Sequence, residues 1–182
     1  MSNRVFNRYK DLALKAEVSL GTNESLEWFK KRIRKDKSLQ HDAVTSGLRR
    51  GTIRPGNMIT YQYFPKHETK LKYYDQYPLI IVLESAKGGW YGANVHYLPP
   101  TMRAALLTEL NYNNKSLSQI ARALENNPIT AVCLKRYLSK QVKSTPVLVP
   151  KDEWEIAIQL PFEKFAKATQ QQVWRNSKRG IR

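Results

Sequence analysis

The chain has 182 residues, of which 41% are apolar and 25% are charged, and a formal net charge of +16, which is typical of a globular protein that binds a polyanion. Its single cysteine, Cys133, excludes an intramolecular disulfide and a cysteine-rich zinc site. The longest apolar run, Leu79–Leu83, is too short to cross a bilayer, and the basic residues 1–10 do not resemble a signal peptide. Nucleic acid is therefore the partner that the composition favours, and a membrane is not.

The positive charge is concentrated towards both ends of the chain. Residues 1–55 hold 13 basic and 6 acidic side chains, and residues 101–182 hold 14 and 6, whereas residues 56–100 hold only 4 and 3. This division predicts a nearly neutral central module between basic segments. We predict three parts: a basic helical N-terminal arm and linker (1–55), a strand module with a helical insertion (56–150), and C-terminal helices with a basic tail (151–182).

Two helices and a linker are predicted in the N-terminal arm. The first helix is indicated by apolar residues at helical spacing, with Gly21 as its stop: Val5, Tyr9, Leu12, Ala13 and Ala16. A second helix, capped by Thr22 or Asn23, would bury Leu26, Phe29 and Ile33. Its other side carries Lys30, Lys31 and Arg34, which either follow a phosphate backbone or simply face solvent. Residues 36–57 read as an irregular linker that carries Arg49, Arg50 and Arg54.

Strand periodicity begins at Met58. Residues Ile59, Tyr61 and Tyr63 would share one face of a strand, and Leu79–Leu83 would form a central strand that is buried on both faces. We interpret Glu84–Lys87 and the following Gly88-Gly89 as a hairpin turn, Trp90–Leu98 as the returning strand and Val147–Val149 as an edge strand. The predicted fold class is α+β, with a small antiparallel curled sheet or SH3-like barrel over residues 57–99, flanked by N- and C-terminal helices.

Aromatic residues crowd the strand region and allow two interpretations. They would either fill the core and rim of a small sheet or stack unpaired bases on its surface, and the core interpretation is favoured for most of them because a small barrel needs large side chains inside it. The polar loop before Leu79 carries Lys66, Lys70 and Lys72, which are better candidates for nucleic-acid contact.

The C-terminal half is predicted to be helical. One helix covers Thr101–Leu110, and a capping box of Ser116 and Gln119 starts the next. Pro128 would open a helix with Cys133 and Tyr137 inward and with Lys135, Arg136, Lys140 and Lys143 outward. Further helices are expected over Lys151–Leu160 and through Phe162, Phe165, Ala166 and Val173, followed by a basic tail with Lys178 and Arg179.

No convincing active site is present in the sequence. A nuclease would place Asp75 with Glu84 and Lys87 around a metal ion, but the spacing of Glu84 and Lys87 would point them to opposite faces of a strand. For His96 we favour a buried imidazole that is hydrogen-bonded to the backbone, and for Cys133 a place in the core. We therefore expect no enzyme, no catalytic residues, no metal and no cofactor.

A block of motifs carries a family resemblance. It runs through Gly56-Asn57-Met58, Tyr73-Tyr74-Asp75 with Tyr77-Pro78-Leu79, and Gly88-Gly89-Trp90-Tyr91-Gly92 with Asn94, His96-Tyr97-Leu98-Pro99. Further likenesses follow at Arg103, at Lys135-Arg136-Tyr137-Leu138 and at Glu153-Trp154. The chain resembles virion-associated proteins of T4-type tailed phages, and within them the DNA end protector group. The resemblance implies a protein that is made in the bacterial host cytoplasm and is carried in the virion beside other phage structural proteins.

Charge and resemblance together predict a virion protein that binds duplex DNA through phosphates, with low sequence specificity, at the packaged genome end near the head-neck region. The alternative is a structural protein of the phage tail, neck or baseplate whose basic arms meet acidic protein surfaces. An oligomer is compatible with either. The candidate DNA contacts are Lys30, Lys31, Arg34, Arg49, Arg50, Arg54, Lys66, Lys70, Lys72, Lys135, Arg136, Lys140, Lys178 and Arg179.

Overall fold

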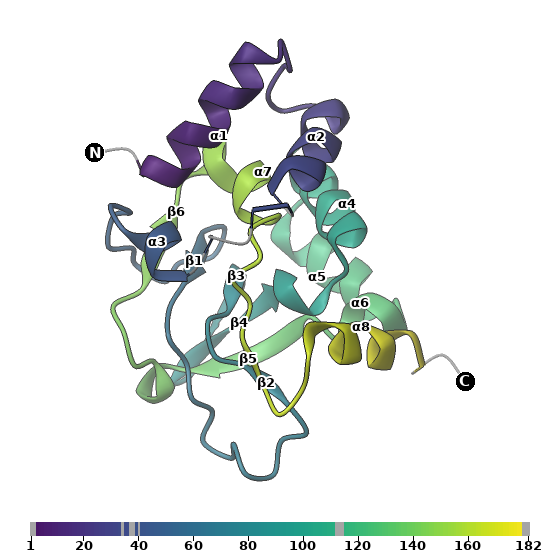
Figure 1. The fold of residues 1–182 in the computed structure, drawn as a ribbon. Coiled ribbons are helices and arrows are strands. Elements are labelled where there is room, and N and C mark those ends of the chain that lie inside the picture. Colours follow the sequence, from purple (N-terminus) through teal and green to yellow (C-terminus); the bar gives the residue numbers. More distant parts are fainter. Residues whose placement is uncertain (1–2, 34, 37–38, 40, 112–114, 180–182) are drawn as a thin grey trace.

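The protein combines an open antiparallel sheet with helices gathered on one side of it (Figure 1). The computed structural model describes residues 3–33, 35–36, 39, 41–111 and 115–179. Five strands pair in the order β5-β4-β3-β1-β6. Their bounds are β1 Met58–Thr60, β3 Leu79–Ala86, β4 Gly89–Asn94, β5 Leu134–Leu138 and β6 Val147–Val149. The predicted α+β class is confirmed, whereas the described strands form a sheet with two edges and not an SH3-like barrel.

Strand β3 is the middle of the sheet, as the unbroken apolar run predicts. All five residues of Leu79–Leu83 are buried, and β3 pairs with β4 on one side and β1 on the other. The pairs Met58–Ile81 and Ile59–Ile80 lie in adjacent register positions and therefore on opposite faces of the sheet. Strand β6 pairs with β1 and closes that side, so the predicted edge strand is confirmed.

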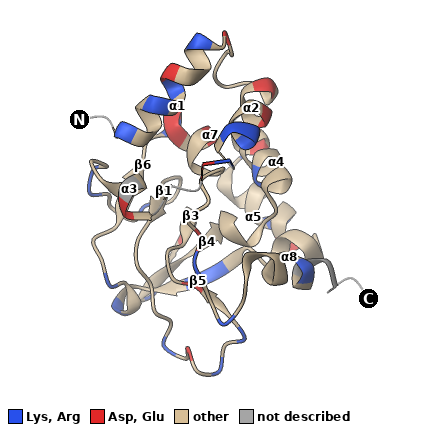
Figure 2. Cartoon of the chain, in the orientation of Figure 1, with Lys and Arg blue, Asp and Glu red and all other residues tan. Residues whose placement is uncertain are grey.

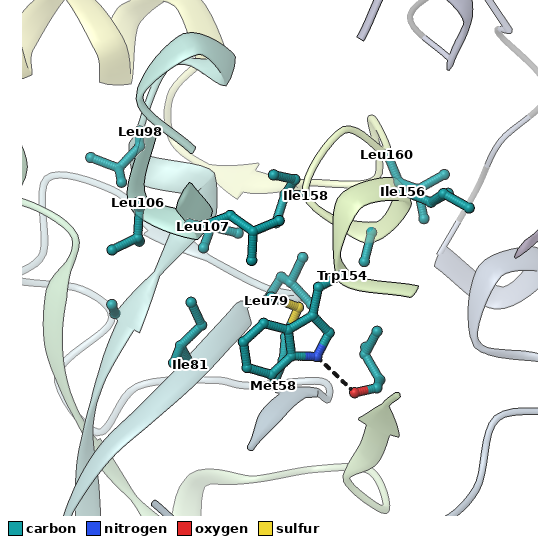
Figure 3. Close-up of a cluster of buried hydrophobic side chains, with 14 of the residues drawn as sticks. Met58, Leu79, Ile81, Leu98, Leu106, Leu107, Trp154, Ile156, Ile158 and Leu160 are labelled. Carbon is teal, nitrogen blue, oxygen red and sulfur yellow. Dashed lines mark hydrogen bonds between the residues drawn. The ribbon is translucent and has the colours of Figure 1, made fainter. Parts of the chain in front are cut away.

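The face that bears Met58 and Ile81 packs against the helices and forms the main core (Figure 3). Trp154 lies at the centre of this core, where its indole Nε1 donates a hydrogen bond of 3.0 Å to the carbonyl oxygen of Val149. The covering helices are α1 Arg4–Lys15, α2 Asn23–Ile33, α4 Pro100–Asn111, α5 Leu117–Glu125 and α7 Trp154–Ala157. Side chains from all three predicted parts of the chain therefore share one core, with Phe6, Met58 and Ile156 as examples.

Local sequence signals explain how helices α2 and α5 begin. The Thr22 hydroxyl oxygen accepts a hydrogen bond of 3.0 Å from the Ser25 backbone N–H at the start of α2, which confirms Thr22 as a cap. The predicted capping box of Ser116 and Gln119 is present at the start of α5. Each cap satisfies backbone N–H groups that have no partner inside the helix.

The opposite face of the sheet carries a smaller aromatic cluster. Tyr61, Tyr63, Trp90 and Tyr137 are buried there with ring centroids 5.0–6.0 Å apart. The core interpretation of these aromatic residues is therefore confirmed. Tyr91, which is 45% exposed, is the clear exception.

Most of the remaining elements are short, and the longest of them is the ten-residue helix α8. They are α3 His41–Thr45, β2 Tyr74–Asp75, η1 Val95–Tyr97, α6 Pro128–Ala131, η2 Ser139–Gln141, η3 Lys151–Glu153, β7 Phe165–Ala166 and α8 Gln170–Arg179. Strands β2 and β7 pair as a separate two-stranded sheet. Within the described ranges, no helix is long and apolar enough to span a membrane.

The predicted helix after Pro128 is mostly wrong. Its first turn forms as α6, but residues Leu134–Leu138 are strand β5, in which Lys135 and Arg136 point to opposite faces. Tyr137 is buried in the structure and would also be buried in the predicted helix. In so short a segment, a strand pattern with a period of two residues and a helix pattern with a period of 3.6 cannot be distinguished. Pairing with the edge of β4 decides in favour of the strand, since it satisfies the backbone groups of Gly89–Ala93.

Five smaller predictions are corrected. Glu84–Ala86 extend β3, so the turn is confined to Lys87-Gly88, and β4 gives way at Val95 to the single turn η1. The linker contains helix α3. Lys151–Leu160 forms only the short η3 and α7, and no helix runs through Phe162–Ala166, which form an extended segment ending in β7. That segment pairs with β2, and this long-range contact is invisible to local periodicity.

Candidate nucleic-acid interface

The loop between β1 and β2 carries three exposed lysines, Lys66, Lys70 and Lys72. On one side its base is bonded to the segment after β5: the backbone N–H of Phe64 donates to the Gln141 carbonyl oxygen at 3.2 Å, and the Lys143 N–H donates to the Gln62 carbonyl oxygen at 2.8 Å. A long loop that is fixed by its neighbours can present cations with little loss of conformational entropy on binding.

On the other side the loop is held by Lys167. The Lys167 ammonium donates hydrogen bonds of 2.5, 3.3 and 3.2 Å to the carbonyl oxygens of Glu68, Thr69 and Leu71. All three ammonium protons are thereby used. The Lys167 backbone has a φ of 65°, a left-handed conformation that costs free energy for a residue other than glycine. Its bonds to the loop offset that cost.

These contacts join three segments into one surface at the lower end of the molecule in Figure 1, which we call the basic end. The segments 64–73, 139–144 and 164–176 contain eight Lys or Arg residues and a single acidic residue, Glu68. The Glu68 carboxylate itself accepts a hydrogen bond of 3.0 Å from the Tyr74 hydroxyl. Figure 2 shows the corresponding blue segments on the lower loop and on α8, whereas most acidic segments lie on the helices above. The cations are Lys66, Lys70, Lys72, Lys140, Lys143, Lys164, Lys167 and Arg175.

Four of the residues predicted from the sequence thus come together at the basic end: Lys66, Lys70, Lys72 and Lys140. Four of its cations are absent from the predicted contacts: Lys143, Lys164, Lys167 and Arg175. A signal for three of these was available, since residues 164–176 contain no acidic side chain. It was missed because those residues were assigned to a helix whose outer face needs no special function.

The two predicted cations on β5 are separated by the strand. The Lys135 ammonium lies 4.4 Å from the centroid of the Tyr97 ring, and burial lowers the pKa of Lys135. Arg136 is exposed, with its guanidinium 5.9 Å from the Tyr91 ring and donating to the Lys87 carbonyl oxygen at 3.2 Å. Arg136 is therefore accessible to a ligand, whereas Lys135 supports an aromatic ring.

The other predicted cations lie away from the basic end. Lys30 pairs with Glu27 at 2.9 Å on α2, and Lys31 is exposed beside it. Arg49, Arg50 and Arg54 are exposed along the opposite edge of the sheet, where Arg50 forms a bridge with Val147 of β6. Arg34 lies outside the described residues. Lys178 and Arg179 belong to the last turn of α8, and their side chains are outside the description.

A buried polar network anchors β2, where the basic loop ends. The Asp75 carboxylate lies 2.7 Å from Nδ1 of His96 and accepts a hydrogen bond of 3.1 Å from the Asn94 side chain. The Asn94 amide also donates to the Tyr137 hydroxyl at 3.2 Å. His96 is therefore buried as predicted, but its imidazole is bonded to a carboxylate and not to the backbone. The Asp75 carboxylate is 1% exposed within this network, whereas Glu84 is exposed on β3.

A buried ion pair anchors α8. The guanidinium of Arg103 donates to the Leu98 carbonyl oxygen at 2.8 Å, to the Ile158 carbonyl oxygen at 3.0 Å and to the Glu163 carboxylate at 2.9 Å. It also lies 5.6 Å from the Trp174 ring of α8. An isolated arginine in an otherwise apolar helical stretch was the available sequence signal. Both networks hold the segments that present the cations.

The comparison with protein families is consistent with this surface. A family model described as "Phage T4 terminal DNA protecting protein" matches residues 3–177, and the chain therefore belongs to this family. The resemblance to the DNA end protector group is thereby confirmed. No curated protein and no solved structure is similar enough to this chain to support a further comparison.

Proposed function

We propose, from the membership of this chain in the Phage T4 terminal DNA protecting protein family, that the protein binds duplex DNA at the end of the packaged phage genome through phosphate contacts. The observation that carries the proposal is the basic end, where eight cations from three segments surround one hydrogen-bonded carboxylate. Each cation that neutralises a phosphate releases condensed counterions, which is the main source of affinity in binding of low sequence specificity.

The protein would protect the DNA end by covering it and not by catalysing a reaction. A protein that covers the terminal base pairs blocks access of an exonuclease, so the role needs no catalytic residue, metal or cofactor. Lysine-rich loop tips suit this task because the flexible ammonium group contacts phosphate oxygens without a fixed orientation. The sequence has no helix-turn-helix or zinc-finger signature, and we therefore expect low sequence preference.

We place the protein in the virion near the head-neck region, beside other phage structural proteins, after synthesis in the bacterial cytoplasm. The exposed Arg49, Arg50 and Arg54 on the far edge of the sheet lie away from the basic end. This second cationic edge could contact either a neighbouring subunit or a further length of DNA. Binding that tolerates neutralisation of this edge but not of the basic end would assign DNA to the basic end.

The proposal is tested by measuring binding of a linear duplex at salt concentrations from about 50 to about 200 mM. The logarithm of the binding constant should fall linearly with the logarithm of salt concentration, with a slope of about −0.9 for each phosphate contacted. The double variant Lys66→Ala/Lys70→Ala should reduce the magnitude of that slope by about 2. The control Arg4→Ala/Lys15→Ala removes the same charge from exposed positions on α1 and should leave the slope nearly unchanged.

Competition with closed circular DNA tests the specificity for ends. A linear duplex should displace the protein from a closed circle of equal length, and bound protein should slow digestion by an exonuclease. Binding that is insensitive to salt refutes phosphate contact. Equal affinity for circle and linear duplex refutes end binding, and absence of DNA binding at moderate salt favours the structural tail, neck or baseplate role.

A further inference from the structure

A cavity of about 370 Å³ opens on the basic end between the long loop and α8. Its lining includes three cations, Lys72, Lys167 and Arg175, together with Tyr73, Gln172 and Asn176, and no carboxylate lines it. The volume is within the usual range for sites that hold a small ligand or one nucleotide. The cavity therefore differs from the open cationic surface around it, because it encloses charge and an aromatic ring together.

The loop side of the cavity is preorganised. Lys167 uses its three ammonium protons on the loop carbonyl oxygens, so it fixes the loop and leaves phosphate binding to its neighbours. Lys72 follows directly after the last of these bonded residues, Leu71, and its ammonium is exposed. Lys167 is thus a positioning residue, and Lys72 is a ligand-binding candidate.

The helix side of the cavity is equally fixed. At the start of α8, the Thr169 N–H donates to the Gln172 side-chain oxygen at 2.8 Å, and the Gln172 N–H donates to the Thr169 hydroxyl at 3.3 Å. Trp174 anchors the helix by donating from Nε1 to the His96 carbonyl oxygen at 3.1 Å. Gln172, Arg175 and Asn176 are spaced three and four residues apart, so they share the helix face that lines the cavity.

Tyr73 contributes an aromatic ring to the lining of the cavity. Its ring centroid lies 6.1 Å from that of Tyr97 and 6.3 Å from that of Phe165, and Tyr97 and Phe165 are themselves 5.1 Å apart. The Lys135 ammonium over the other ring, Tyr97, adds a further positive charge behind this group. A half-buried ring that is held in this way can stack a terminal base without losing much freedom.

We infer that this cavity binds the terminal phosphate monoester of a DNA strand, with Lys72 and Arg175 as its cationic ligands and Tyr73 beside the terminal nucleoside. The inference rests on the proposed DNA function and adds how an end is distinguished from internal duplex. A monoester carries a charge of about −1.5 to −2 at neutral pH, whereas each internal phosphodiester carries a single charge. Arginine can bind such a group in a bidentate manner, and the Gln172 and Asn176 amides supply further donors.

The probes for this inference are blunt duplexes that carry a 5′-phosphate, a 3′-phosphate or only hydroxyl groups at their ends, together with a closed circle of similar length. The wild-type protein should bind one of the phosphate-bearing ends about tenfold more tightly than the hydroxyl end. Comparison of the 5′-phosphate duplex with the 3′-phosphate duplex identifies the strand end that enters the cavity. Lys72→Ala and Arg175→Ala should each abolish most of that preference. Both side chains are exposed, so both variants should fold.

Lys15→Ala and Arg4→Ala are the matched controls, since each removes one exposed charge from α1. They should keep the preference for the phosphate-bearing end. Equal binding of all three linear ends, or variants of Lys72 and Arg175 that keep the preference, overturns the inference. If linear duplex is still preferred over the circle in that case, the proposed end-binding function stands without this cavity. If the preference for linear duplex is lost as well, the proposed function fails with it.

Discussion

The buried guanidinium of Arg103 allows a quantitative test of how the basic end is held in place. We consider the substitution Arg103→Met, which keeps most of the side-chain length but removes every hydrogen-bond donor. The side chain of Arg103 is 2% exposed and that of its partner Glu163 is 4% exposed, so water cannot readily replace the lost bonds. The carboxylate of Glu163 is left unpaired in the interior.

The expected cost follows from these contacts. Breaking a buried ion pair by removing one partner costs about 3–5 kcal/mol, because the remaining charge is left uncompensated. Arg103 also donates to the carbonyl oxygen of His96 at 3.4 Å. Without Arg103 the carbonyl oxygens of Leu98 and Ile158 lose a donor, whereas that of His96 keeps its bond from Trp174. We therefore expect a loss of about 4 kcal/mol in the free energy of unfolding, or a decrease in melting temperature of about 10 °C for a chain of this size.

The assay is urea and thermal unfolding followed by tryptophan fluorescence and far-ultraviolet circular dichroism. Arg122→Met, at an exposed position on α5, is the control and should change stability by about 0.5 kcal/mol or less. The double variant Arg103→Met/Glu163→Met removes both charges and should be more stable than Arg103→Met alone. A loss below about 1 kcal/mol for Arg103→Met, or a double variant that is less stable still, would refute the assignment of Arg103 to a buried anchoring role.

Three further predictions follow from buried groups and close backbone contacts. Burial lowers the pKa of His41 in the folded protein, so the unfolded chain takes up a proton at a higher pH than the folded chain does. The contribution of His41 to the free energy of unfolding should be full above about pH 6.5 and should fall below that pH by at most about 1.4 kcal/mol per pH unit. His41→Gln should flatten this pH dependence in unfolding titrations. Burial raises the pKa of Cys133 to about 12, so a thiol reagent at pH 8 should label the folded protein far more slowly than the urea-unfolded chain; equal rates would contradict a core position. A Cβ at Gly89 would lie 1.8 Å from the Tyr137 carbonyl oxygen, so Gly89→Ala should lower the free energy of unfolding by about 1–3 kcal/mol in denaturant titrations. A Cβ at Gly88 would meet open space, and only its φ of 75° opposes alanine, so Gly88→Ala should lower the free energy of unfolding by less.

Local signals were sufficient for the centre of the sheet and for most helix starts. The apolar run Leu79–Leu83 and the capping box at Ser116 each depend on neighbours within a few residues, and each is found where it was predicted. The hairpin is also present, although its turn is at Lys87-Gly88 and Gly89 already belongs to β4. The alternation from Met58 also assigned Ile59 and Tyr61 correctly to one face. In these cases the physical cause acts within the same stretch of sequence that carries the pattern.

The errors share a different cause. Strands β5 and β7 form because they pair with the open edges of β4 and β2. Both segments are too short for their hydrophobic pattern to identify them as strands. The carboxylate partner of His96 lies 21 residues earlier in the chain, at Asp75, so no local pattern could identify it. The candidate site was half predicted for the same reason: the lysines of the long loop are visible as a cluster in the sequence, whereas Lys167 and Arg175 join them only through tertiary contacts.

The pairing of β1 with both β3 and β6 has a consequence for biogenesis. During synthesis, β1, β3 and β4 leave the ribosome early and can pair as a local unit, but β6 is translated only after the whole helical insertion and β5. Until then the outer edge of β1 has no strand partner and the nascent chain can associate through it with other copies. Completion of the sheet by such a distant segment also predicts slow folding, since loop closure must precede the stabilising contacts. Production of this protein should therefore improve at low temperature, where translation and aggregation are slowed together.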